Sequence, residues 1–208
     1  MGETAQLTAL HRKLDHHYPA AYLMAWAGGV RPDWTEFLHR MFSELLPARL
    51  GCQGSTVLDL GCGPSISSVI PASQWASNIY LAELLEGNRR EIQRWLGREE
   101  GAWNWDPYFQ FQAELEPGED ESSVERRLRS RLAGVMECDL AARPVLDTAR
   151  TRGPVDVLIC SLVFDVVCLD SAGLEEVMGR ALELLQEGWK QLHLFCFFGL
   201  IFKYHYSK

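Results

Sequence analysis

Residues 55–64 run Ser-Thr-Val-Leu-Asp-Leu-Gly-Cys-Gly-Pro, and this stretch decides the fold. Its first six residues form a short run of strand-forming residues that ends in turn residues, which is typical of a buried strand in a parallel sheet. Gly61 and Gly63 allow the backbone to turn sharply with no Cβ in the way, and Pro64 stiffens the turn. The stretch therefore predicts a buried strand that ends in a tight glycine turn.

The sequence around this strand alternates between strand and helix patterns. Apolar residues at helical spacing predict a helix that begins near Asp33 and ends before Pro47. Strands alternating with helices predict an α/β fold, in which helices cover both faces of a doubly wound, mainly parallel sheet. We expect one such domain over residues 51–208, after an N-terminal helical extension over residues 1–50. The further expected strands are 79–82, 135–140 and 155–160, the further expected helices are 85–96, 121–134 and 172–186, and residues 97–117 are expected to be irregular.

Composition and charge narrow the function classes. With 20 basic and 28 acidic side chains, the 208-residue chain carries a net charge of −8, which disfavours a general affinity for nucleic acid or for an anionic membrane. Arg126, Arg127 and Arg129 alternate with Glu and Ser, which predicts a solvated helix face. The six cysteines lack metal-binding or redox spacing and are expected to be reduced thiols. The sequence shows no apolar leader and no run long enough to cross a bilayer, so we expect a cytoplasmic protein. We also expect it to be a monomer.

The glycine turn favours a ligand that carries a nucleoside. In doubly wound sheets, ligands bind beyond the carboxyl ends of the strands. The dinucleotide motif needs a third glycine, and Ile66 stands at that position, so a pyrophosphate fits poorly. A smaller ligand with a nucleoside and a carboxylate fits better. Asp59, one residue before the end of the strand, is expected to fasten the turn by accepting backbone N–H bonds.

Two acidic residues follow neighbouring strands. Glu83 lies about twenty residues beyond the glycine turn, a placement suited to accepting both hydroxyls of a ribose, although an exposed helix-capping acid is the alternative. Asp139 lies at the end of the next predicted strand and is placed to accept the amino group of an adenine, or to be a solvated acid. The glycine turn that precedes these two residues favours the ligand-binding interpretation of both.

Several motifs together resemble one family. Residues 58–64 look like the first motif of S-adenosyl-L-methionine-dependent methyltransferases. The match extends to the family of nicotinamide, phenylethanolamine and indolethylamine N-methyltransferases, from about Tyr18 to Gly188. Its further motifs are Tyr22-Leu23, Glu-Gly-Asn-Arg-Arg-Glu at 86–91, Trp95-Leu96, Gly-Ala-Trp-Asn-Trp at 101–105, and Cys138-Asp139-Leu140. The resemblance implies a Rossmann-like class I methyltransferase fold, S-adenosyl-L-methionine as cofactor, and methyl transfer to the nitrogen of a small amine or pyridine-type substrate.

The resemblance also implies roles for individual residues. Residues 1–50 would cover the cofactor site, and Asp165 would lie near the substrate amine. The implied cofactor contacts are Tyr22 closing over the cofactor, Gly61, Cys62 and Gly63 at its methionine part, Glu83 and Asn88 at the ribose, Asp139 and the Leu140 backbone at the adenine, and Ser161 on the methionine side.

The C-terminal region departs from the family pattern. Relatives continue past the helix at 172–186 with a fifth strand and two further strands, whereas here only residues 187–208 follow. This tail predicts the fifth strand, and the last two are expected to be missing. A weakly active or inactive relative that keeps the cofactor half-site is therefore the alternative function. A nicotinamide-dependent oxidoreductase is disfavoured by Ile66, and a base methyltransferase by Cys-Ser-Leu-Val at 160–163.

Overall fold

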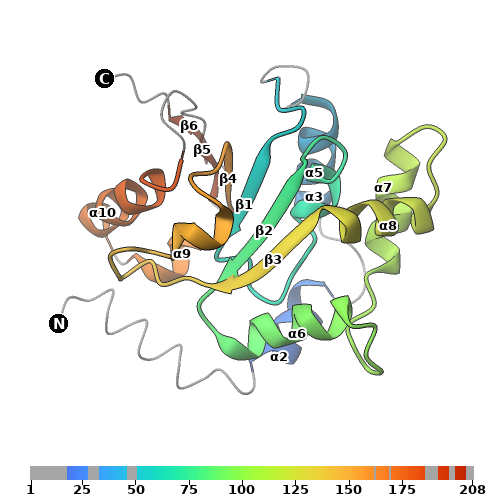
Figure 1. The fold of residues 1–208 in the computed structure, drawn as a ribbon, viewed down its shortest axis with the longest axis horizontal. Coiled ribbons are helices and arrows are strands. Elements are labelled where there is room, and N and C mark those ends of the chain that lie inside the picture. The colour runs from blue at the N-terminus through green and yellow to red at the C-terminus, as the bar shows by residue number, and fades with distance from the viewer. Residues whose placement is uncertain are drawn as a thin grey trace.

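A mainly parallel sheet, as predicted from the alternating pattern, organises the computed structural model. The structure describes residues 18–27, 33–45, 51–161, 163–168, 170–185, 192–196 and 200–204. Within them, one sheet has the strand order β3-β2-β1-β4-β5-β6 (Figure 1). Its strands are β1 (Thr56–Leu60), β2 (Asn78–Glu83), β3 (Leu132–Glu137), β4 (Val157–Ser161), β5 (Leu192–Cys196) and β6 (Leu200–Tyr204). Neighbours from β3 to β5 pair in parallel, which confirms the doubly wound α/β fold.

The strand β1 lies inside the sheet, as residues 55–64 predicted. Val57 pairs with Ile79 of β2 on one side and with Val157 of β4 on the other. Side chains alternate between the two faces of a strand, so Val57 enters one apolar cluster while Leu58 and Leu60 enter the other. Burial on both faces explains why the run carries apolar residues at successive positions.

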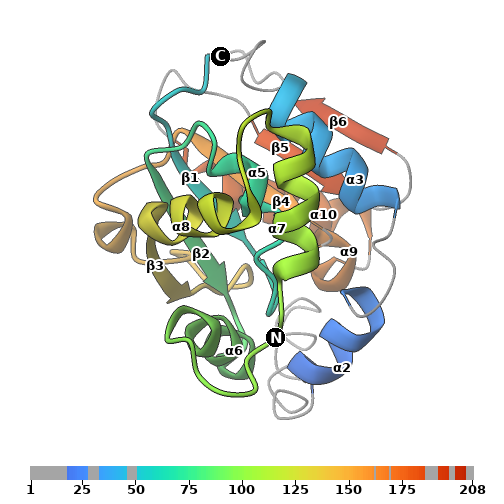
Figure 2. The same ribbon diagram turned by 90° about the vertical axis from the view of Figure 1, so that its right-hand side faces the viewer.

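Helices cover both faces of the sheet. Leu38, Phe109 and Leu128 belong to one apolar cluster, and Phe164 and Val177 belong to the other. Figure 2 shows α3, α7 and α8 on the near side of the sheet, with α9 and α10 behind it. No helix of the described residues is long and apolar enough to cross a membrane. The helices are α2 (Tyr18–Trp26), α3 (Asp33–Arg40) with the π-helical turn η2 (Met41–Leu45), α5 (Val69–Ala72), α6 (Glu86–Leu96), α7 (Asp106–Leu115), α8 (Glu121–Arg131), the 3-10 turn η3 (Thr148–Thr151), α9 (Phe164–Val167) and α10 (Ser171–Leu182).

The helix α7 corrects the expectation that residues 97–117 are irregular. It starts after Trp105, with Pro107 in its first turn, and it buries Tyr108, Phe109 and Phe111. Proline is compatible with the first turn of a helix because the N–H it lacks has no intrahelical partner there. Pro107 therefore lies in the first turn of a helix, within a segment that we expected to be irregular.

The boundary between α8 and β3 also differs from the prediction. The helix ends at Arg131, and the strand runs over residues 132–137 instead of 135–140. A glycine at 134 lies within the strand, paired with Tyr80 of β2. Glycine commonly follows the last turn of a helix, so Gly134 suggested that the helix ends there, three residues later than it does.

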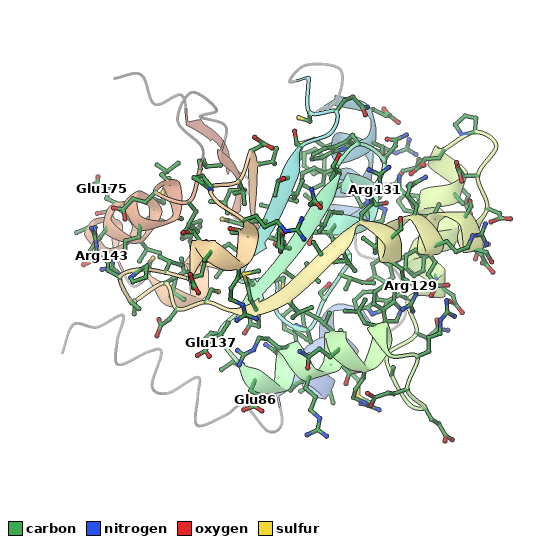
Figure 3. The ribbon with its side chains drawn as sticks, in the orientation of Figure 1. Glu86, Arg129, Arg131, Glu137, Arg143 and Glu175 are labelled. Carbon is green, nitrogen blue, oxygen red and sulfur yellow. The ribbon has the colours of Figure 1, made fainter. Side chains whose placement is uncertain are left out.

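Two of the three arginines predicted to be solvated bind other elements. Arg129 donates from Nη1 to the Leu96 carbonyl at 3.1 Å and from Nη2 to the Trp95 carbonyl at 3.0 Å, and its guanidinium lies 3.9 Å from the centre of the Trp95 ring. Figure 3 shows Arg129 between α8 and α6. Arg127 forms an ion pair with Glu116 at 2.7 Å. Only Arg126 is exposed as expected.

The C-terminal tail adds two strands. β5 pairs in parallel with β4, which confirms the predicted fifth strand. β6 pairs antiparallel with β5. The expectation that both final strands are missing is therefore wrong for one of them, because one antiparallel strand is present. Only residues 197–199 separate β5 from β6, too few for the crossover that a parallel connection requires.

Candidate functional site

The candidate site lies where the carboxyl ends of the parallel strands meet. In Figure 1 the arrowheads of β2 and β3 point toward α9 and the start of α6. The end of β1 is tied to the end of β2, because Gly61 donates its N–H to the Ala82 carbonyl at 2.8 Å. The end of β2 is tied to the segment after β3 by a bond of 3.3 Å from the Cys138 N–H to the Glu83 carbonyl. The predicted site residues on these three strands therefore share one edge.

Both glycines of the turn adopt left-handed backbone conformations. Gly61 has φ +72° and Gly63 has φ +63°, a region that side chains with a Cβ rarely occupy. A Cβ on Gly61 would lie 2.1 Å from Cγ2 of Val163, in the segment after β4. Val163, which the sequence did not identify, therefore fills the space beside Gly61. A Cβ on Gly63 would meet the Tyr22 ring at an ordinary 3.8 Å.

Glu83 is buried and holds the glycine turn. Its Oε2 accepts the Gly63 N–H at 3.0 Å, and its Oε1 accepts the Leu85 N–H at 2.9 Å and Asn88 Nδ2 at 3.1 Å. Burial raises the pKa of this carboxyl, and the three hydrogen bonds work against that rise. A carboxylate offers about four lone-pair sites, so three are used inside the chain. The alternative of an exposed helix-capping acid is wrong, since only 7% of Glu83 is accessible.

Asn88 and Arg89 complete this end of β2. The Asn88 side chain is buried, and its Oδ1 has no hydrogen-bond partner within the described part of the chain. Arg89 donates from Nη1 to the carbonyls of Glu83 at 2.8 Å and Leu84 at 2.6 Å. Side chains of Glu83 and Arg89 thus hold the backbone after β2 by hydrogen bonds. Oδ1 of Asn88 is the buried acceptor here that has no donor among the described residues.

Asp59 has a different role from the predicted one. Its Oδ2 accepts a hydrogen bond from the Ser68 hydroxyl, just before α5, and not from the backbone of the turn. Its Oδ1 is buried and has no hydrogen-bond partner among the described residues. Burial raises the pKa of Asp59 to about 7, the charge of Glu83 adds to the rise, and the Ser68 bond opposes it. Asp59 therefore fastens the approach to α5.

The turn after β3 carries the predicted pair Asp139 and Leu140. Asp139 donates its N–H to the Val145 carbonyl at 2.8 Å, and its Oδ1 accepts the Ala141 N–H at 2.9 Å. The Leu140 carbonyl accepts a bond of 2.6 Å from Nη1 of Arg180 in α10. Arg180 is a second residue that sequence reasoning missed, because nothing in the pattern of α10 links it to this turn.

The remaining predicted residues have different surroundings. Cys62 is buried, and its Sγ lies 3.4 Å from the Gly63 carbonyl; burial raises the pKa of the thiol. Ser161 ends β4, and its Oγ is buried with no hydrogen-bond partner in the described ranges. The ring of Tyr22, in α2, lies on the side of the turn that a Cβ of Gly63 would face. Asp165 lies in α9, but its side chain lies outside what the structure describes.

Comparisons with known proteins identify the family of the chain. The sequence model of the NNMT/PNMT/TEMT family matches residues 6–197. Phenylethanolamine N-methyltransferase of Macaca mulatta is 32% identical over 137 residues, which cover 65% of this chain and 49% of that protein. Indolethylamine N-methyltransferase of Oryctolagus cuniculus is 31% identical over 155 residues, which cover 74% of this chain and 56% of that protein.

A solved structure supports the fold. Magnesium protoporphyrin IX methyltransferase from Synechocystis PCC 6803, crystallised with bound SAH, aligns with a TM-score of 0.53 at 17% identity. The alignment covers 86% of this chain and 68% of that one. The chain spans about half the length of the curated relatives it matches. Because the family model covers most of its residues, the chain belongs to the NNMT/PNMT/TEMT family, as its motifs predicted.

Proposed function

We propose that this chain is a methyltransferase that binds S-adenosyl-L-methionine at the carboxyl edge of its sheet and methylates the nitrogen of a small amine or pyridine-type substrate. The observation that carries the proposal is the bond of 3.0 Å between the Gly63 N–H and Oε2 of Glu83. It joins the glycine turn and the acidic end of β2 into one structure. Relatives named as phenylethanolamine and indolethylamine N-methyltransferases support the choice of nitrogen as acceptor.

The buried polar groups after β2 suit a ribose. Glu83 keeps about one lone-pair site beyond its three bonds, and Asn88 Oδ1 is a buried acceptor without a partner in the described chain. A buried acceptor that lacks a donor costs free energy, and a ligand hydroxyl would supply the donor. Glu83 and Asn88 would therefore hold the two ribose hydroxyls together.

The neighbouring strand ends provide for the other parts of the cofactor. Asp139 would accept the adenine amino group, with the Leu140 backbone beside it. Ser161, whose buried Oγ has no partner within the described residues, would bind the methionine part together with the turn at Gly61–Gly63. Tyr22 approaches this turn from α2, which supports our proposal that the N-terminal extension, residues 1–50, covers the cofactor site of a single domain.

The reaction places modest demands on the protein. S-adenosyl-L-methionine supplies a methyl group that is bound to a sulfonium. The leaving group is then a neutral thioether, which needs no protonation when a nitrogen lone pair attacks the methyl group. Positioning and electrostatics then make up most of the protein's contribution. Asp165, in α9 beyond the end of β4, would orient the amine or a positively charged ring through its carboxylate. We extend the proposal to a cytoplasmic location, for which the scattered cysteine spacing is the support, and to a monomer.

Ligand-induced stabilisation tests cofactor binding. S-adenosyl-L-homocysteine at 100 times its dissociation constant should stabilise the fold by about 2.7 kcal/mol, seen as a rise in Tm, and NADH should leave the Tm unchanged. The variant Glu83→Ala should lose the shift. The matched control Glu86→Ala, an exposed residue at the start of α6 (Figure 3), should retain it. An unchanged shift in Glu83→Ala would place the cofactor elsewhere, and no shift in the parent protein would reject the cofactor site.

Transfer of a labelled methyl group tests the catalytic half of the proposal. A panel of primary amines, secondary amines and pyridines is incubated with labelled cofactor, and the products are counted. Product from any class supports an N-methyltransferase. Binding of S-adenosyl-L-homocysteine with no product from any class would favour the alternative, a relative that keeps only cofactor binding.

A further inference from the structure

We propose that Arg180 is a positioning residue that fixes the turn at Asp139–Leu140 and thereby sets the selectivity of the site for adenine over other purines. The inference rests on the proposed function. It assigns a role to a residue of α10, a helix that contributes no other residue to the candidate site.

The contact joins two elements that are distant in sequence. Nη1 of Arg180 donates to the Leu140 carbonyl at 2.6 Å, across 40 residues of chain. Nη2 of the same guanidinium is paired with Glu176, one helical turn earlier, whose side chain is 61% exposed. The Arg180 side chain itself is only 9% exposed. The ion pair thus reaches the surface, whereas the bond to the turn lies inside the molecule.

Burying the Arg180 guanidinium costs more free energy than hydrogen bonding of one carbonyl would require. Nε of Arg180 is buried without a partner in the described part of the chain, so the guanidinium is not fully compensated. A buried charge costs free energy unless it is paired and hydrogen-bonded. A carbonyl at this position needs only one neutral donor or a water molecule for its own hydrogen bonding. A planar, permanently charged donor adds a fixed direction for the carbonyl it binds.

Fixing the Leu140 carbonyl orients the groups that would recognise the base. Asp139 is already held by its own N–H, bound to the Val145 carbonyl at 2.8 Å, and by the Ala141 N–H on its Oδ1 at 2.9 Å. The Leu140 N–H donates to no described residue. The turn therefore presents a carboxylate acceptor next to a backbone donor. With the Leu140 carbonyl bound by Arg180, rotation of this part of the turn is restricted.

This pair of groups matches adenine and opposes hypoxanthine. Adenine offers an amino donor beside a ring-nitrogen acceptor, so each group meets its complement. Hypoxanthine offers a carbonyl acceptor beside an N–H donor, which places acceptor against acceptor and donor against donor. Such mismatches discriminate strongly when the polar groups of the site are held in place, and weakly when they can turn away.

The test measures a ratio of affinities. Dissociation constants of S-adenosyl-L-homocysteine and S-inosyl-L-homocysteine are measured by calorimetry for the parent protein, Arg180→Met, Arg180→Lys and the control Arg143→Met. Arg143 joins the same loop to the end of α10 by an ion pair of 3.3 Å with Glu183, but both side chains are more than half exposed (Figure 3). We expect Arg180→Met to reduce the adenine preference about tenfold, Arg180→Lys to reduce it less because one charged donor remains, and Arg143→Met to preserve it.

Each outcome separates the possible explanations. A merely structural role for Arg180 would lower the Tm and weaken both ligands equally, leaving the ratio unchanged, and that result would overturn the inference. If Arg180→Met does not unfold cooperatively, Arg180→Lys carries the same comparison, and an unchanged ratio in it counts against the inference. If the parent protein binds neither ligand, the proposed function itself fails. Binding by the parent with a lost preference in the Arg180 variants supports both.

Discussion

Two buried glutamates show how differently this chain treats its structural and its ligand-binding regions. Glu116, between α7 and α8, is 4% exposed and pairs with the Arg127 guanidinium at 2.7 Å, with Gln112 donating to the same oxygen at 2.6 Å. Glu83, at the end of β2, is 7% exposed and accepts two backbone N–H groups and one amide. The first carboxylate is neutralised by a cation. The second is oriented by neutral donors and forms no ion pair among the described residues, although the charge of Arg89 also opposes the rise of its pKa.

The hydrogen bonds around the two glutamates can be compared in the same way. The network around Glu116 continues from Gln112 to Ser43 at 2.7 Å and from Arg127 to Ser73 at 3.2 Å, so it ties α7 and α8 to η2 and to the end of α5. Around Glu83, buried oxygens of Asp59 and Asn88 lack partners within the described residues, and in the network around Glu116 one oxygen, Oε1 of Gln112, lacks one as well. Buried polar groups are normally satisfied, so exceptions grouped at one strand edge are a signature of a ligand site.

The largest expected effect comes from breaking the structural pair. Arg127→Met should lower the free energy of unfolding by about 3–5 kcal/mol, because it leaves Glu116 as a buried, uncompensated charge. Urea unfolding followed by circular dichroism measures the change. The control Arg126→Met, an exposed position on the same helix, should change stability by about 0.5 kcal/mol or less. Equal effects at the two positions would show that the pair contributes nothing specific.

A smaller effect is expected where the site depends on shape instead of charge. Gly61→Ala should cost about 2–4 kcal/mol, since φ is +72° and the new Cβ would lie 2.1 Å from Val163. Gly63→Ala should cost about 1–2 kcal/mol, because its φ of +63° is equally strained but its nearest neighbour, Tyr22, is 3.8 Å away. Urea denaturation of both variants gives the comparison. Similar losses would mean that backbone strain alone explains both, and that Val163 moves aside at little cost.

The sequence predicted those features of the site that depend on short-range pattern. The strand at 56–60, its glycine turn and Glu83 follow from local alternation of apolar runs, turn residues and strand ends, and the structure brings them to one edge. Local pattern was misleading at α7, where Pro107 lies in the first turn of a helix, and at Gly134, which lies in a strand. In both places the residue type allows two structures, and tertiary packing selects between them.

Contacts between distant segments could not be predicted in this way. Val163 fills the space beside Gly61 from the segment after β4, and Arg180 reaches Leu140 from α10. Neither residue differs in type from others that point into a core or lie on a helix face. The partner of Asp59 was also missed, because a serine nine residues further along competes with the nearer backbone N–H groups. Such pairings are decided by the packing of whole elements.

A pH-dependent effect is expected from the other buried carboxylate of the site edge, Asp59, which like Glu83 forms no ion pair in the described chain. Its pKa is raised to about 7 in the folded state, mainly by burial, against about 3.9 when unfolded. The native state therefore binds the proton more tightly. Its contribution to stability is complete below pH 4 and is lost as the pH rises toward and through 7, by about 2 kcal/mol between pH 5 and pH 7.

Asp59→Asn keeps an acceptor for Ser68 without a charge, so its stability should vary much less over this range. Urea unfolding at half-unit pH steps compares the two slopes, and parallel curves would show that Asp59 does not titrate there. A flat curve for Asp59→Asn would instead extend the contrast with Glu116, because it would show that the charge of Asp59, which forms no ion pair among the described residues, is carried at a measurable cost to the fold.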